Sequence, residues 1–234
     1  MIDINTPEGK VIAATLRLAG ERDWASVSLR DIADAAGITL AELRETFGSK
    51  TAILTAYGKL VDTDVLSKMS KPDPEESPRD QLFEAIMARF DAMNPHKDAI
   101  ASIVESREAD PAIVRSIMES QSWMLQAAGI GTDGMKGSIR VAGLTSLYGS
   151  VVRTWLTDDD PGMAKTMAVL DRRLRRGEQT MQNVESALSV CERVTGMLRP
   201  GNFGFGSRSS SAPRDEFDTG DMPPESGSAT GSSA

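Results

Sequence analysis

The chain has 234 residues, 40% of them hydrophobic, and a formal net charge of −8, so it is long enough to bury a sizeable core. Its single cysteine excludes an internal disulfide framework and fits a reducing compartment, so we expect a cytoplasmic protein. No apolar run approaches the roughly 20 residues that a membrane-spanning helix needs, and the acidic balance disfavours broad, nonspecific attraction to nucleic acid.

The spacing of apolar residues predicts an all-α fold, because they recur at three- and four-residue steps and no sustained alternation marks a strand. The first predicted helix covers residues 7–20. Two short helices follow, opening at Ser28 and Thr39, and each carries the hydroxyl-to-acid spacing of a capping box. Gly37 between them permits the left-handed residue of a tight turn. This pattern predicts a helix-turn-helix, with an ordinary helical hairpin as the alternative.

The sequence also predicts a helical body behind this head. A fourth helix at residues 50–69 leads into a proline-rich linker, and the head with this helix forms a predicted domain at residues 1–69. A second domain, residues 78–197, contains predicted helices at 78–93, 96–107, 111–128 and 136–156, another that starts at Asp160 and Pro161, and a weaker one at 178–197. The helix at 136–156 is apolar around much of its circumference, so we expect burial on more than one side.

Residues 198–234 form a tail rich in glycine, serine and proline, which predicts disorder because it cannot bury enough apolar surface. A docking motif made of Phe203, Phe205 and Phe217 is the alternative interpretation of this segment.

Catalytic chemistry has little support in the sequence. His96 is the only histidine and follows a proline at a predicted helix start, so we expect it to be a surface or capping residue. One histidine and one cysteine do not make a zinc site, and no phosphate-binding glycine loop or nucleophile elbow is present. We therefore expect no catalytic residues, no metal, no cofactor and no enzymatic activity.

Two features of the body leave alternatives open. The basic run Arg172–Arg176 either complements a helix C-terminus or contacts an anionic lipid or partner. The 12 methionines suit a deformable apolar pocket, although methionine at helical spacing also builds an ordinary core. The candidate pocket residues are Phe83, Met87, Phe90, Met118, Met124, Leu144, Tyr148 and Trp155.

Residues 10–58 resemble the N-terminal domain of the TetR family of transcriptional regulators, through the run "LRDIADAAGI", Leu43, Phe47 and the "FGSK" that ends in Lys50. The resemblance implies a TetR-like fold, in which a three-helix, helix-turn-helix head joins a helical body for dimerisation and ligand binding. It also implies DNA-contacting roles for the following residues: Leu40, Ala41, Arg44 and Thr46 on the exposed face of a recognition helix, and Ser28, Thr39 and Lys50 near phosphates.

The head departs from the family in its charge. The family usually has a polar or basic residue at the position of Leu40 and an aromatic one at that of Arg44. Residues 1–70 contain eight Lys and Arg against ten Asp and Glu, a net charge of −2. Because phosphate contacts need cations or aimed amides, the candidate cations are few: Arg30, Arg44 and Lys50. Arg44 can also take a guanine edge with two hydrogen bonds.

Two body segments, "LFEAIMARFDAMNPHKDAI" and "TWLTDDDPGMAKTMAVLDRRLRRGE", resemble lipid-binding accessory proteins of ubiquinone biosynthesis. That resemblance implies an isoprenoid lipid in the helical pocket and a vestigial helix-turn-helix. The chain departs from this group because it ends in a polar tail instead of an amphipathic membrane-contacting helix.

Two functional hypotheses follow. The first is a TetR-type regulator, a homodimer that binds a double-stranded DNA operator as a repressor and is released by a small apolar effector. The second is a lipid-binding accessory protein of ubiquinone biosynthesis. We favour the first, because the turn, both caps and Lys50 are complete in the head.

Overall fold

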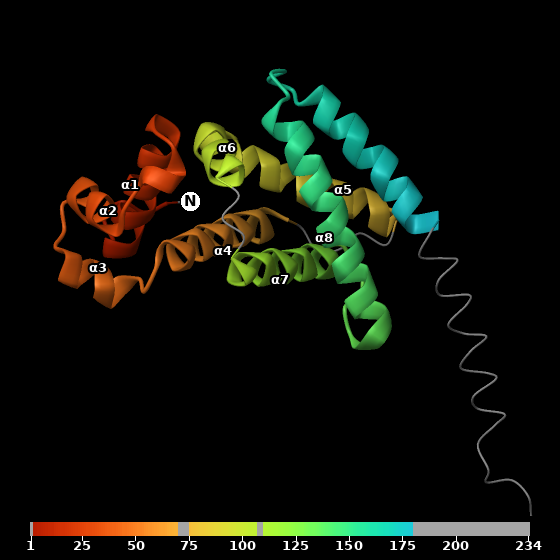
Figure 1. Cartoon of the computed structure of the whole chain (residues 1–234). Helices are drawn as coiled ribbons and strands as arrows, with labels where there is room; N and C mark the ends of the chain where they lie inside the picture. The colour runs from red at the N-terminus through yellow and green to blue at the C-terminus, as the bar shows by residue number, and fades with distance from the viewer. Residues whose placement is uncertain (1, 70–74, 107–109, 180–234) are drawn as a thin grey trace, which may run out of the picture. The chain divides into compact units, whose positions relative to one another are not determined.

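Every regular element in the described residues, 2–69, 75–106 and 110–179 of the computed structural model, is a helix (Figure 1), which confirms the predicted all-α fold. All of these residues lie in one compact unit, Met1–Glu192. The elements are α1 (Pro7–Glu21), the 3₁₀ turn η1 (Trp24–Ser26), α2 (Leu29–Ala36), α3 (Leu40–Thr46), α4 (Lys50–Lys68), α5 (Pro78–Met93), the 3₁₀ turn η2 (Asn94–His96), α6 (Lys97–Glu105), α7 (Pro111–Ala127), α8 (Gly134–Leu156) and a final helical segment at residues 164–179.

Several predictions fall on residues outside this description. They are most of the weak helix predicted at 178–197 and the whole tail at 198–234, with Phe203, Phe205 and Phe217. Among the described helices, none is long and apolar enough to cross a bilayer.

Side-chain caps explain where most of the helices begin. Thr6, Ser28, Thr39, Ser49 and Ser77 each accept a backbone N–H of the first turn through the hydroxyl oxygen. A cap of this kind satisfies one of the amides that a helix leaves without an internal acceptor. The predicted starts of these helices are confirmed because the signal lies within four residues of each start.

The final helix begins at residue 164 and not at Asp160 and Pro161 as predicted. Asp160 instead forms a turn, in which its carbonyl accepts from Met163 N (2.8 Å) and its carboxylate accepts from Ala164 N (3.0 Å). Asp158 is buried beneath this turn and accepts from the amide and hydroxyl of Thr166 (2.8 and 2.7 Å). The aspartates therefore cap a helix that starts one turn later than the Asp-Pro pair indicates.

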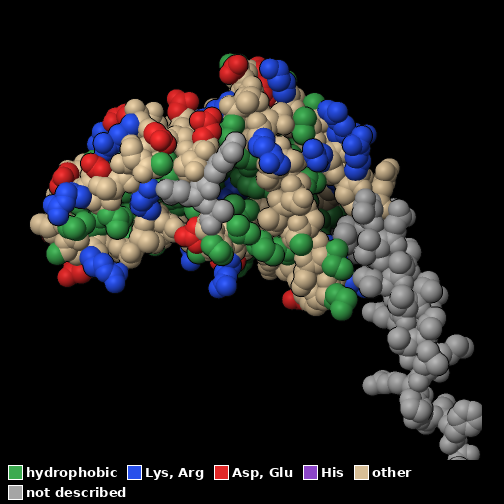
Figure 2. Space-filling view, viewed as in Figure 1, with side chains coloured by type: hydrophobic (Ala, Val, Ile, Leu, Met, Phe, Trp, Pro, Cys, Tyr) green, Lys and Arg blue, Asp and Glu red, His purple; other side chains and the backbone are tan. Residues whose placement is uncertain are grey.

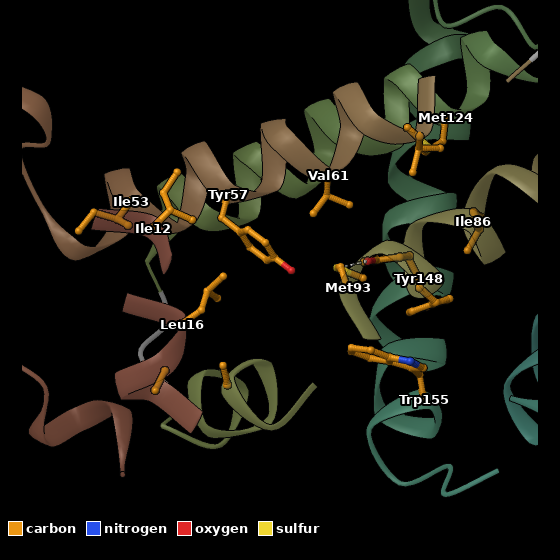
Figure 3. Close-up of a cluster of buried hydrophobic side chains, with 14 of the residues drawn as sticks. Ile12, Leu16, Ile53, Tyr57, Val61, Ile86, Met93, Met124, Tyr148 and Trp155 are labelled. Carbon is orange, nitrogen blue, oxygen red and sulfur yellow. Dashed lines mark hydrogen bonds between the residues drawn. The ribbon is translucent and has the colours of Figure 1, made fainter. Parts of the chain in front are cut away.

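The head packs α1, α2, α3 and the first half of α4 around a shared apolar core. Its fully buried side chains include Ile12, Trp24, Ile32, Leu43 and Ile53, and Figure 3 shows Ile12 and Ile53 facing each other from α1 and α4. The apolar face predicted for the first helix, with Val11 and Leu16, is buried as expected. This core holds α3 from beneath and leaves its outer face uncovered.

Head and body are joined by direct contacts as well as by α4. Helix α1 packs on α6, and the Trp24 amide donates to Ser102 Oγ (3.0 Å), which in turn donates to the Arg22 carbonyl (3.3 Å). Thr51 Oγ1 at the start of α4 donates to Asp110 Oδ2 at the start of α7 (2.5 Å). These contacts connect α6 and α7 directly to the base of the helix-turn-helix.

The long helix α8 is buried along one side only, by Gly137, Leu144, Tyr148, Val151 and Trp155. Its exposed positions are mostly small: Ser138, Ala142, Gly143, Ser146 and Gly149. The single chain therefore buries one side of α8, and burial of a second side between two copies of the chain stays a prediction. The apolar residues Ile139, Val141, Leu147 and Val152 are only half-buried and flank this outer strip of small residues.

Candidate nucleic-acid interface

The turn between α2 and α3 fixes how α3 is presented. Gly37 adopts φ 71° and ψ 32°, in the left-handed region where a side chain is strained. Its amide donates to the Asp34 carbonyl (3.2 Å), and the Ile38 amide donates to the Ala33 carbonyl (3.1 Å). These two bonds close the C-terminus of α2, and the chain then turns directly into Thr39, the N-cap of α3.

Helix α3 lies on the head with one face inward and one outward. Leu43 is buried and Phe47 nearly so, whereas Leu40, Ala41, Arg44 and Glu45 are exposed. Leu40 is 42% exposed, so its side chain is accessible to a partner. The structure thus places four of the predicted recognition residues, Leu40, Ala41, Arg44 and the half-buried Thr46, on one accessible helix.

The hydroxyls predicted to approach phosphate are engaged inside the head. Ser28 Oγ donates to Asp31 Oδ2 (2.6 Å), and Thr39 Oγ1 donates to Glu42 Oε2 (2.7 Å). The amides of the two capping residues donate to the same carboxylates (2.8 and 2.7 Å), so both predicted capping boxes are confirmed. Thr46 Oγ1 likewise donates to the Glu42 carbonyl (2.9 Å).

These hydrogen bonds also fix charge at the two helix starts. The bonds from Ser28 lower the pKa of the Asp31 carboxyl, and those from Thr39 lower that of Glu42. Both groups are therefore ionised at neutral pH and offset the positive ends of α2 and α3. An approaching phosphate meets two fixed negative charges where the resemblance to regulators implies donors.

Lys50 has an internal role that the sequence does not reveal. Its Nζ donates to the Trp24 carbonyl (3.0 Å) and lies 4.0 Å from the centre of the Trp24 ring. The ammonium thereby ties the start of α4 to the turn after α1. Any phosphate contact by Lys50 has to share an ammonium that already stabilises the head.

Arg30 and Arg44 are the predicted cations that remain accessible. Both side chains are exposed, and neither forms an ion pair or a hydrogen bond with any residue that the structure describes. The Arg44 guanidinium lies beside the backbone of Gly48, since a Cβ placed on that glycine would be 3.2 Å from Arg44 Nη1. Figure 2 shows acidic and basic side chains interspersed over the visible face of α1–α3, without a continuous basic patch.

Ser49 is a candidate DNA contact that the sequence analysis did not predict. It is exposed and caps α4 by accepting from Ala52 N (3.1 Å), and its own O–H donates to no described residue. The first turn of α4 contains no acidic residue, in contrast to α2 and α3. The sequence "SKTA" shows this lack of an acidic residue. The start of α4 is therefore the one helix start of the described head where no carboxylate offsets the positive end of the helix dipole.

The predicted pocket residues divide into two groups. Phe90, Met124, Leu144, Tyr148 and Trp155 are buried in the core of the body, with the Phe90 ring 5.5 Å from Tyr148 and 5.3 Å from Trp155. Phe83 and Met87 are half-buried, and Met118 is 37% exposed on α7. Two surface clefts, of about 470 and 370 Å³, lie between α1 and α6 and between α4, α6 and α7, and neither is lined by these residues.

A buried polar network, which the sequence reasoning also missed, crosses the body. Asp62 on α4 and Arg89 on α5 form an ion pair, and both residues are less than 10% exposed. Ser120 Oγ on α7 donates to Asp62 Oδ2 (2.5 Å), and Arg89 Nε donates to the Tyr148 hydroxyl on α8 (3.1 Å). The signal in the sequence is a charged residue beside a buried apolar one, as in "VD" at 61–62 and "RF" at 89–90.

His96 stands at the N-cap position of α6, in line with the predicted capping place, but it does not lie fully on the surface. Its ring is half-buried and meets the Tyr57 ring edge-on, with 5.8 Å between centroids, and its side chain makes no cap bond to α6. Burial lowers the pKa of His96 and favours the neutral ring. Within the described residues, no group of three or more His, Cys, Asp or Glu side chains is placed to hold a metal.

Comparison with known proteins assigns the head and the fold. Residues 11–57 match the model of the bacterial regulatory proteins of the tetR family. A TetR transcriptional regulator from Nitrosomonas europaea shares the fold with a TM-score of 0.57 and 20% identity, over 72% of this chain and 96% of that one. A TetR regulator from Rhodococcus sp. RHA1 gives 0.56 and 19%, over 72% and 93%.

A tetR-family regulator from Streptomyces coelicolor gives a TM-score of 0.54 and 16% identity, over 86% of this chain and 92% of that one. The sequence has no match among curated proteins. At these identities the solved structures establish the fold, and the family model establishes the head. Residues 11–57 are therefore similar to the N-terminal domain of tetR-family regulators, and the chain shares the fold of the solved TetR regulators.

Proposed function

We propose that this protein is a DNA-binding transcriptional repressor that acts as a homodimer and is released by a small ligand held in its helical body. The observation that carries the proposal is α3, a capped helix whose exposed outer face carries the accessible guanidinium of Arg44. In a helix-turn-helix, the second helix enters the major groove and the first crosses the backbone. Leu40, Ala41 and Arg44 then face base edges.

Dimerisation rests on the outer side of α8. Ser138, Ala142, Ser146 and Gly149 form a strip of small residues along it, which lets a second helix approach closely, and the adjacent segment 164–179 exposes Met167. Two copies paired there present two α3 helices, which bind half-sites about one DNA turn apart. Ala142→Glu should make the protein monomeric in analytical ultracentrifugation, whereas Gln126→Glu, on the exposed side of α7, should not.

The test of DNA binding is retardation of the protein's own upstream DNA at increasing salt. With Arg30 and Arg44 of both heads on phosphate, four contacts give a log–log slope of about −4. If Arg44 instead reads a guanine, the slope is about −2, and Arg44→Ala lowers affinity by about 10- to 100-fold for each head without changing the slope.

Arg17→Ala is the matched control, because Arg17 is exposed on α1 and paired with Glu21 (3.2 Å). It should leave both affinity and slope unchanged. An unrelated DNA fragment of equal length gives the nonspecific baseline. Equal retardation of the two fragments, or an equal effect of the two arginine substitutions, contradicts sequence-specific regulation by α3.

The second candidate, a lipid-binding accessory protein of ubiquinone biosynthesis, is favoured by the acids around the recognition helix. Asp34, Glu42 and Glu45 are all exposed, and Glu42 is held ionised at the start of α3. If micromolar protein retards no genomic fragment while the purified protein yields isoprenoid lipid on organic extraction, this second function replaces the first.

A further inference from the structure

The polar network of the body offers more hydrogen-bonding capacity than it uses. Within the described residues, the Tyr57 hydroxyl, both amide atoms of Gln121 and Trp155 Nε1 are buried without a partner. Native interiors leave few such groups unpaired. A purely apolar effector would leave all of them unpaired, so these groups indicate a ligand that itself carries polar atoms.

These unpaired groups lie on the same helices as the residues that contact the Asp62–Arg89 pair, or pack against their neighbours. Gln121 follows Ser120, the donor to Asp62, and Trp155 contacts Phe90, the neighbour of Arg89. Burial raises the pKa of the Tyr57 phenol, so the hydroxyl stays protonated, and the positive charge of Arg89 interacts electrostatically with it. Figure 3 shows the Tyr57 hydroxyl directed toward Met93 and the hydroxyl of Tyr148.

We infer that the body binds an amphipathic carboxylic acid whose carboxylate replaces that of Asp62 on Arg89. A planar guanidinium pairs with a carboxylate through two parallel hydrogen bonds, which an ester or an alcohol cannot reproduce. The apolar chain of the acid packs among Phe90, Met93 and Met124, which belong to the same buried cluster. Methionine side chains adapt readily to a flexible chain.

The inference rests on the proposed function for its regulatory consequence. Asp62 belongs to α4, which begins at Lys50, directly after α3 and Gly48. Because Asp62 occupies the guanidinium in the structure, the acid binds only as Asp62 leaves. Binding therefore selects conformations in which α4 is released from α5, and the orientation of α3 changes with α4.

The experiment titrates the full-length protein with linear carboxylates from hexanoate to dodecanoate by calorimetry, each against the alcohol of the same length. The acid of the preferred length should bind about tenfold or more tightly than its alcohol, since the charged contact to Arg89 is lost in the alcohol. Asp62→Asn removes the competing carboxylate and should tighten acid binding by about tenfold or more.

Two control variants isolate the site. Asp64→Asn changes the same charge two residues further along α4, where the carboxylate is paired with Lys68 (2.6 Å), and should leave acid binding unchanged. Arg89→Lys keeps the charge and loses the planar fork, so it should reduce the preference for acid over alcohol. Arg79→Lys on α5, where the arginine is paired with Asp80, is the control for that change.

Each outcome decides the matter. Equal affinity for acid and alcohol, or no binding of any acid by either the native protein or Asp62→Asn, overturns the inference while DNA retardation remains a separate result. Acid binding that is sensitive to Asp62 and Arg89 in a protein that retards no DNA keeps the acid site and removes its regulatory role.

Discussion

Gly37→Ala tests whether the turn between α2 and α3 is under the conformational constraint that its geometry indicates. At φ 71°, an L-residue is destabilised by about 1–2 kcal/mol relative to its usual conformations. A Cβ at this position meets no atom within 4 Å, so steric contact adds nothing. Alanine also lowers the conformational entropy of the unfolded chain, which stabilises the folded state by about 0.4–1 kcal/mol and leaves a net destabilisation of about 1 kcal/mol.

The matched substitution is Gly58→Ala in the interior of α4. Its Cβ would lie 3.9 Å from Ser116 Oγ, an ordinary contact, and alanine in a helix interior stabilises by about 0.5–1 kcal/mol over glycine. One chemical change thus has opposite effects at two sites. Thermal unfolding by circular dichroism should separate the two variants by several degrees, at about 2–4 °C per kcal/mol.

Gly37→Asn sharpens the comparison, because asparagine tolerates the left-handed region better than alanine, and it should fall between alanine and glycine in stability. If Gly37→Ala and Gly58→Ala shift the melting temperature in the same direction, the turn is not constrained as described. The presentation of α3 would then need another explanation.

Three further predictions concern single side chains. Arg89→Met leaves the Asp62 carboxylate buried without its partner and should lower the free energy of unfolding by about 3–5 kcal/mol, measured by urea denaturation. Lys50→Met removes the hydrogen bond and ring contact to Trp24 and should destabilise the head by about 1–2 kcal/mol. DNA binding by this variant therefore has to be measured at a temperature where the head stays folded, because unfolding alone would also abolish binding. Because burial lowers the pKa of His96, the unfolded chain takes up a proton near pH 6.5 before the folded chain does. The free energy of unfolding should therefore fall as the pH drops below 6.5 toward the lower pKa of the folded state. His96→Gln should abolish that decline, and an unchanged pH profile in this variant would contradict the prediction.

Local chemistry explains why so much of the helical framework is predictable. A capping residue and its hydrogen-bond partner are at most four residues apart, as with Ser28 and Asp31. Their spacing in the sequence is therefore enough to predict that the cap forms. The same holds for Gly37, whose conformational freedom is a property of one residue. The prediction failed at Asp160, where the carboxylate was close enough to cap a later turn.

The candidate site is only partly readable in this way. That Leu40 and Arg44 share a helix follows from spacing, and the exposed strip of α3 follows from Leu43 and Phe47 facing the core. Which cations remain accessible does not follow, because it depends on partners far away in the chain. Lys50 contacts Trp24 across 26 residues, whereas Arg44, six positions earlier, has no ion-pair or hydrogen-bond partner in the described part of the chain.

The sequence by itself determined the helices, their caps, the turn at Gly37 and the scarcity of positive charge in the head, since all of these depend on residue type and on neighbours within one helical turn. Only the tertiary structure decided that Asp62 and Arg89 pair inside the body, that α8 buries a single side, and that His96 packs against Tyr57. Those contacts join helices whose separation along the chain says nothing about their packing, because burial and pairing depend on the three-dimensional arrangement of all the helices together.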